Sequence, residues 1–63
     1  MYVIRKDNIF YGKGGTSGDT PESVELFKEL ISANRLFNKI GGQIIDLEKR
    51  RIIKDDRFSK KNS

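Results

Sequence analysis

Apolar residues near the start of the chain fall into two short groups, residues 2–4 and 9–11, on either side of Asp7 and Asn8. Their β-branched and aromatic side chains favour strands, whereas Asp and Asn tolerate turn geometry. The pattern predicts a β-hairpin with Asp7 and Asn8 at its tip. The cross-strand pairs predicted from this turn are Lys6 with Ile9, Arg5 with Phe10, and Ile4 with Tyr11.

A polar stretch follows at residues 12–19, GKGGTSGD, with four glycines and no large apolar side chain. It predicts a mobile loop. Helix-start signals come next, because Thr20 suits an N-cap, Pro21 suits the first helical position and Glu22 favours the positive end of the helix dipole. We therefore expect a helix with its N-cap at Thr20 that runs to about Ile40 and is ended by the glycine pair at 41–42.

This predicted helix carries two apolar stripes. Residues at alternating spacings of four and three form the expected core stripe, which consists of Leu26, Leu30, Ala33, Phe37 and Ile40. A second stripe of Val24, Phe27 and Ile31 lies roughly 100 to 160 degrees around the helix from Leu26. One helix on one thin sheet can bury only one side, so this second stripe is the candidate protein interface.

The segment after the glycine pair, QIIDLEKRRIIKDD, contains two isoleucine pairs separated by a polar run. β-branched pairs favour a second hairpin, with Glu48 and Lys49 at the turn. The predicted cross-strand pairs are Asp46 with Arg51, Ile45 with Ile52, and Ile44 with Ile53. A helix over residues 44–58 is the alternative, because the segment contains helix formers throughout.

The order strand, strand, helix, strand, strand predicts a small ββαββ domain of the α+β class, with antiparallel hairpins packed against one central helix. The pattern leaves open whether the two hairpins share one sheet. We expect a single domain over residues 1–56. Residues 57–63 have little to bury and are expected to form a disordered basic tail.

Composition limits the chemistry of this chain. It has 63 residues and neither Cys nor His, which excludes disulfides, thiolate metal sites and a histidine base. A core this thin offers no pocket for shifting pKa values, so we expect no enzyme, no cofactor and no metal site. The acids Asp46, Glu48, Asp55 and Asp56 are interspersed with lysines, which is typical of solvating charges.

The glycine loop ahead of the predicted helix also invites a phosphate-binding hypothesis. Its details disfavour that hypothesis. The loop lysine, Lys13, comes too early for a P-loop. Asp19 and Glu22 would place carboxylates at the predicted helix start, where they would repel an anion, and Pro21 removes an N–H donor.

The formal net charge is +4, and the basic excess lies in residues 43–63. A basic hairpin tip with a basic tail can lie against a phosphate backbone. The candidate nucleic-acid contacts are Lys49, Arg50, Arg51, Lys54 and Arg57. Solvated turn charges that protect a sheet edge are the alternative interpretation of the same residues.

No stretch resembles a signal peptide or a membrane span, so we expect a cytoplasmic protein with no membrane partner. The favoured function is a small non-enzymatic protein-binding regulator or inhibitor that self-associates or docks on a larger protein through the apolar helix face. The alternative is a nucleic-acid-binding protein. The composition is also typical of small accessory proteins from phages and mobile elements.

Overall fold

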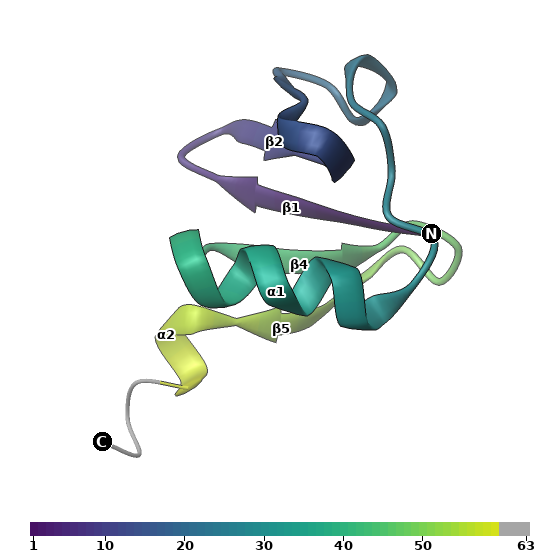
Figure 1. Ribbon diagram of the computed structural model, residues 1–63. Helices are drawn as coiled ribbons and strands as arrows, with labels where there is room; N and C mark the ends of the chain where they lie inside the picture. Colours follow the sequence, from purple (N-terminus) through teal and green to yellow (C-terminus); the bar gives the residue numbers. More distant parts are fainter. Residues whose placement is uncertain (60–63) are drawn as a thin grey trace.

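The strand β1 (Tyr2–Lys6) lies at the centre of a five-stranded antiparallel sheet in this computed structural model, which describes residues 1–59 and only the backbone of residues 58 and 59. On one side it pairs with β2 (Ile9–Tyr11), and on the other with β4 (Gln43–Asp46). The sheet order is β3-β2-β1-β4-β5, and Figure 1 shows β2, β1, β4 and β5 of this sheet in that order. The two predicted hairpins therefore join in one sheet.

The outer strands of the sheet differ in length. At one edge, β3 (Ser17–Gly18) has two residues and pairs with β2. At the other edge, β5 (Arg51–Asp55) has five residues and pairs with β4. The one long helix of residues 1–59, α1 (Leu30–Ile40), packs on β1 and β4. The predicted α+β class, with antiparallel hairpins against one helix, is confirmed.

The first hairpin has the predicted register, with Ile4 opposite Tyr11, Arg5 opposite Phe10 and Lys6 opposite Ile9. Asp7 and Asn8 both have positive φ, 53° and 68°. Two-residue hairpin turns of this kind match the right-handed twist of the strands, and Asn and Asp tolerate them well. The Asn8 side chain also accepts a hydrogen bond from Arg5 Nη2 at 3.0 Å.

The second hairpin follows the strand interpretation, and the helical alternative for residues 44–58 is wrong for β4 and β5. Ile45 lies opposite Ile52 and Asp46 opposite Arg51, as predicted. The predicted pairing of Ile44 with Ile53 is wrong, because a β-bulge inserts Ile53 and places Lys54 opposite Ile44. The extra residue turns Ile53 toward the core.

The turn between β4 and β5 is held by the side chain of Asp46. Its Oδ1 accepts hydrogen bonds from the backbone N–H groups of Glu48 and Lys49, at 3.0 and 3.3 Å. Arg50 adopts a φ of 55° at the end of the turn. An Asp that bonds to the backbone two and three residues ahead replaces the turn glycine that the sequence lacks.

The predicted helix start at Thr20 is wrong. Thr20 and Pro21 begin only a 3-10 turn over Pro21–Ser23, and α1 begins at Leu30. Between them the chain is extended, and Phe27 exchanges two backbone hydrogen bonds with Tyr2, of 2.8 and 2.9 Å. Pairing with the sheet and burial of Phe27 replace the helical turns that the local signals favoured.

The core lies between α1 and the sheet. Its buried members are Ile4, Phe27, Ala33, Phe37 and Ile44. Half-buried side chains pack around them, namely Tyr2, Tyr11, Leu36, Ile40 and Ile53. The predicted core stripe is therefore correct for Ala33, Phe37 and Ile40. It is wrong for Leu26, which lies outside α1, and for Leu30, which is 40% exposed.

The predicted loop at residues 12–19 contains local structure. Lys13–Gly15 forms a 3-10 turn, and β3 follows it. The backbone N–H of Lys13 donates to the carbonyl of Glu25, and the N–H of Glu25 donates to Thr16 Oγ1. These bonds attach the loop to the extended segment that leads into α1.

The helix ends at the predicted glycine pair. Gly41 N–H donates to the carbonyl of Phe37 at 2.8 Å, and Gly41 and Gly42 have φ values of 76° and 91°. Gly42 also passes close to β1, because a Cβ at this position would lie 2.6 Å from the carbonyl oxygen of Arg5. Both the backbone conformation and the close approach require glycine at Gly42.

The chain continues beyond the predicted domain boundary at residue 56. Residues Asp56–Ser59 form a short helix, α2, directly after β5. The predicted disordered tail thus begins within a helical segment. Its remaining residues, 60–63, lie outside the described residues.

We expect Gly42→Ala to lower the free energy of unfolding more than Gly15→Ala does. Both glycines have positive φ, so each substitution costs about 1–2 kcal/mol for the left-handed backbone. A Cβ at Gly15 meets no atom within 4 Å, whereas one at Gly42 would clash with β1, which adds at least ~1 kcal/mol. Urea denaturation measures both, and equal losses would contradict the close approach.

Candidate functional site

The three predicted interface residues do not share a helix face, and that prediction is wrong in its geometry. Val24 and Phe27 precede α1 and are buried, with Phe27 in the core cluster. Ile31 lies in the first turn of α1 and is 60% exposed. The apolar spacing at 24, 27 and 31 does not mark a second helix face, because Val24 and Phe27 are buried in the segment ahead of α1.

Phe27 and Ile31 should therefore respond differently to truncation. We expect Phe27→Ala to lower the free energy of unfolding by about 3–5 kcal/mol, since it removes a buried aromatic ring from a thin core. Ile31→Ala should change it by less than about 0.5 kcal/mol, because the side chain is exposed. Thermal and urea unfolding of the two variants give the comparison, and a stable Phe27→Ala variant would contradict the core assignment.

The predicted basic set is spread over both ends of β5 and does not converge. Lys49 and Arg50 are exposed in the β4–β5 turn, and Arg51 begins β5. Arg57 lies past the other end of the strand, in α2. The predicted nucleic-acid contacts are therefore divided between the two ends of β5, with Lys49, Arg50 and Arg51 at one end and Arg57 at the other.

The remaining basic residue, Lys54, is turned toward α1. Its Nζ donates to Asn34 Oδ1 at 3.0 Å and lies 5.2 Å from the ring centroid of Phe37. A cation over an aromatic face is attracted by the ring quadrupole. This contact attaches β5 to the helix and directs the lysine away from the turn that carries Lys49 and Arg50.

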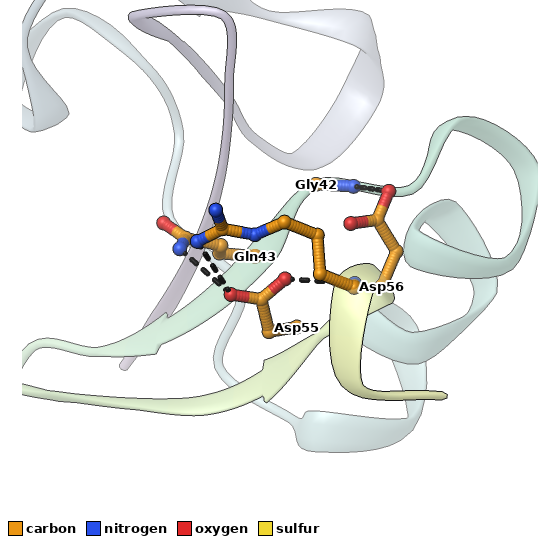
Figure 2. Close-up of polar contacts among 5 residues, drawn as sticks. Gly42, Gln43, Asp55 and Asp56 are labelled. Carbon is orange, nitrogen blue, oxygen red and sulfur yellow. Dashed lines mark hydrogen bonds and ion pairs between the residues drawn. The ribbon is translucent and has the colours of Figure 1, made fainter. Parts of the chain in front are cut away.

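The densest polar cluster of the described chain surrounds Asp55 and Asp56, where β5 meets α2 (Figure 2). Asp55 Oδ2 accepts hydrogen bonds from Gln43 Nε2 at 3.0 Å and Arg57 Nη2 at 3.4 Å. Its Oδ1 accepts the backbone N–H of Arg57 at 2.9 Å. Asp55 is buried, so these donors compensate its lost hydration.

Asp56 joins α2 to the glycine pair. Its Oδ2 accepts the N–H of Gly42 at 3.0 Å (Figure 2). Its own N–H donates to the Gly42 carbonyl at 3.0 Å. A Cβ at Gly41 would lie 2.6 Å from the same carboxylate oxygen. Asp56 thus connects the glycine pair at the end of α1 to the end of β5.

The donors around Asp55 also set its ionisation. The Gln43 side-chain hydrogen bond, followed by the Arg57 backbone N–H, holds the pKa of Asp55 below its ordinary value of 3.8, against the opposing effect of burial. The Arg57 guanidinium is 77% exposed, so its ion pair with Asp55 is a minor contribution. The ionised carboxylate is therefore the form that the fold stabilises.

This direction predicts a pH dependence of stability. Because the folded-state pKa lies below the unfolded value, the stabilisation is present above pH 3.8 and is lost as the pH falls through the folded-state pKa. We expect Asp55→Asn to lower the melting temperature at neutral pH, with a difference from wild type that shrinks toward about pH 2. Circular dichroism melts across this range measure it.

Asp19→Asn, which removes an exposed carboxylate, is the control for the change in net charge. A wild-type advantage over Asp55→Asn that stays constant from neutral to acidic pH would contradict the assigned ionisation.

The cluster borders a hollow of about 310 Å³ between the β1–β2 turn and α2. Its lining balances three bases, Arg5, Lys6 and Arg57, against three acids, Asp7, Asp55 and Asp56. Among the described residues, no group of three or more His, Cys, Asp or Glu could hold a metal ion. The arrangement fits a structural role at the end of the sheet better than the binding of a charged ligand.

Ile52 is the half-exposed apolar side chain of β5, with 50% of its surface exposed. Ile45, opposite Ile52, lies next to Ile44, which faces α1, so both Ile45 and Ile52 face away from the helix. A hollow of about 260 Å³ runs past Ile52, Ile53 and Lys54. The isoleucine pattern predicted the strand but not its position at the sheet edge, which depends on the sheet order.

Comparisons with known proteins give no relative: no family model, no curated protein and no solved structure matches this chain. Among residues 1–59, no helix has the length and apolar character needed to span a bilayer.

Proposed function

We propose that this chain is a small non-enzymatic protein-binding domain, acting as a regulator or inhibitor, and that it binds through the β5 edge, defined as residues Arg51–Lys54. We further propose a second copy of the chain as the partner at this edge. The observation that carries the proposal is an outer strand with a half-exposed isoleucine on it. A role in binding rather than catalysis is supported by the lack of His and Cys.

The two edges of the sheet differ in how they are protected. β3 has only two residues, and the 3-10 turn at Pro21–Ser23 packs against it so closely that a Cβ at Gly18 would clash with Ser23. β5 is longer and is the last strand of the sheet on its side in the described chain (Figure 1). Exposed edge strands present backbone donors and acceptors that can pair with another chain.

The side chains on the β5 edge also favour a partner. Lysine commonly protects edge strands against association, but Lys54 is bonded to Asn34 and lies over Phe37. Ile52 remains half exposed beside an apolar hollow. A strand laid along this edge would cover Ile52 on one face of the sheet and Ile53 on the other.

The edge is compatible with self-pairing about a two-fold axis. If Ile52 lies opposite Ile52 of the second copy, Arg51 lies opposite Ile53, and each pair has both side chains on the same face of the extended sheet. Between Arg51 and Ile53 no two like charges are directly opposed, whereas Lys54 lies opposite Arg50 of the second copy at each end of the pairing. A second subunit is also a usual source of stability for a domain of this size.

Sedimentation equilibrium of wild type, Ile52→Lys and Ile31→Lys tests the proposal. Both isoleucines are exposed, so both variants should fold, which far-ultraviolet circular dichroism verifies. We expect wild type to dimerise at roughly 100 μM, Ile52→Lys to be monomeric and Ile31→Lys to remain a dimer. A charge in the middle of the paired strands would be buried without a partner.

Two results would overturn the proposal. The first is a wild-type monomer at the same concentration. The second is a dimer that survives Ile52→Lys but is lost in Ile31→Lys, which would place the contact on the exposed start of α1 instead.

A further inference from the structure

A second concave surface lies on the side of α1 away from β5, between the helix and the glycine loop. It is a groove of about 190 Å³. The helix contributes Ser32, Arg35, Leu36 and Lys39, whose spacings of three and four put them on one flank. The opposite wall is formed by Gly12, Gly14 and Gly15, and Phe27 also lines the groove.

The charged residues of this groove have one sign. Arg35 and Lys39, one turn apart, are exposed, and neither makes a hydrogen bond or ion pair with any described residue. No carboxylate lines the groove. The adjoining hollow of about 200 Å³ adds Lys13 and Lys28 beside Glu29, so the cationic character is strongest at the end that holds Arg35 and Lys39.

The opposite wall is backbone rather than side chain. Gly14 and Gly15 have φ values of 71° and 79°, and a Cβ on either would meet no atom within 4 Å. Glycines with open space beside them let a ligand approach the peptide groups closely. Glycine backbone facing two cations and a serine hydroxyl is a combination that suits a phosphate group, which carries about −1.5 to −2 charge at pH 7.

We infer that this groove binds the phosphate group of a small ligand, with Arg35 and Lys39 as the cationic contacts and Ser32 as a hydroxyl donor. From the sequence, Asp19 and Glu22 were expected at the start of the helix, where their carboxylates would repel a phosphate. Because α1 begins at Leu30, neither carboxylate lines the groove. The basic turn at Lys49–Arg51 does not line it either, which favours a small ligand over a nucleic-acid backbone.

The test is a heteronuclear NMR titration of the whole chain with inorganic phosphate and, separately, with adenosine 5′-monophosphate. We expect concentration-dependent amide shifts at Gly14, Gly15 and Ser32 with at least one of the two probes. The double variant Arg35→Gln, Lys39→Gln should weaken binding at least ~tenfold. The control Lys49→Gln, Arg50→Gln removes the same charge from the exposed turn and should change binding less than about twofold.

The two probes separate free phosphate from a phosphate ester, and shifts with either support the site. No shift at these amides with roughly 10 mM of each probe would overturn the inference. Equal weakening by the two double variants would also overturn it, because only net charge would then matter. A response at these amides to a short DNA duplex alone would replace the small ligand with a polyanion.

Discussion

The pairing of β1 with β4 is the interaction on which the rest of this fold depends. Val3 and Ile4 are fully buried in β1, and they lie opposite Ile45 and Ile44 of β4. This pairing joins two local hairpins into one sheet and so creates the surface on which α1 packs. Without it each hairpin would be a two-stranded ribbon, which is marginally stable in water.

The features that could be predicted from sequence are those decided by neighbouring residues. Asp7 and Asn8 set the register of the first hairpin, because the turn geometry is local. The start of α1 and the bulge at Ile53 could not be predicted, since each depends on distant contacts. Phe27 pairs with Tyr2, and the residue after the bulge, Lys54, bonds to Asn34.

The same distinction applies to the candidate sites. The basic residues were identified by composition, but the sheet order separates them and directs Lys54 into a contact with α1. Ile52 was predicted as half of a cross-strand pair, which is correct, yet its exposure follows from β5 being outermost. Similarly, Arg35 and Lys39 became a candidate site only because the glycine loop folds against their flank of the helix.

α1 organises both proposed surfaces through its two flanks. On one flank, Asn34 and Phe37 hold Lys54 and so leave Ile52 as the prominent side chain of the β5 edge. On the other, Arg35 and Lys39 line the groove opposite the glycine loop. The buried residues Ala33 and Phe37 fix the helix between them. Because the two surfaces share no side chain, the proposed self-association and the proposed phosphate binding are physically separable, and we expect a variant that removes one to leave the other intact.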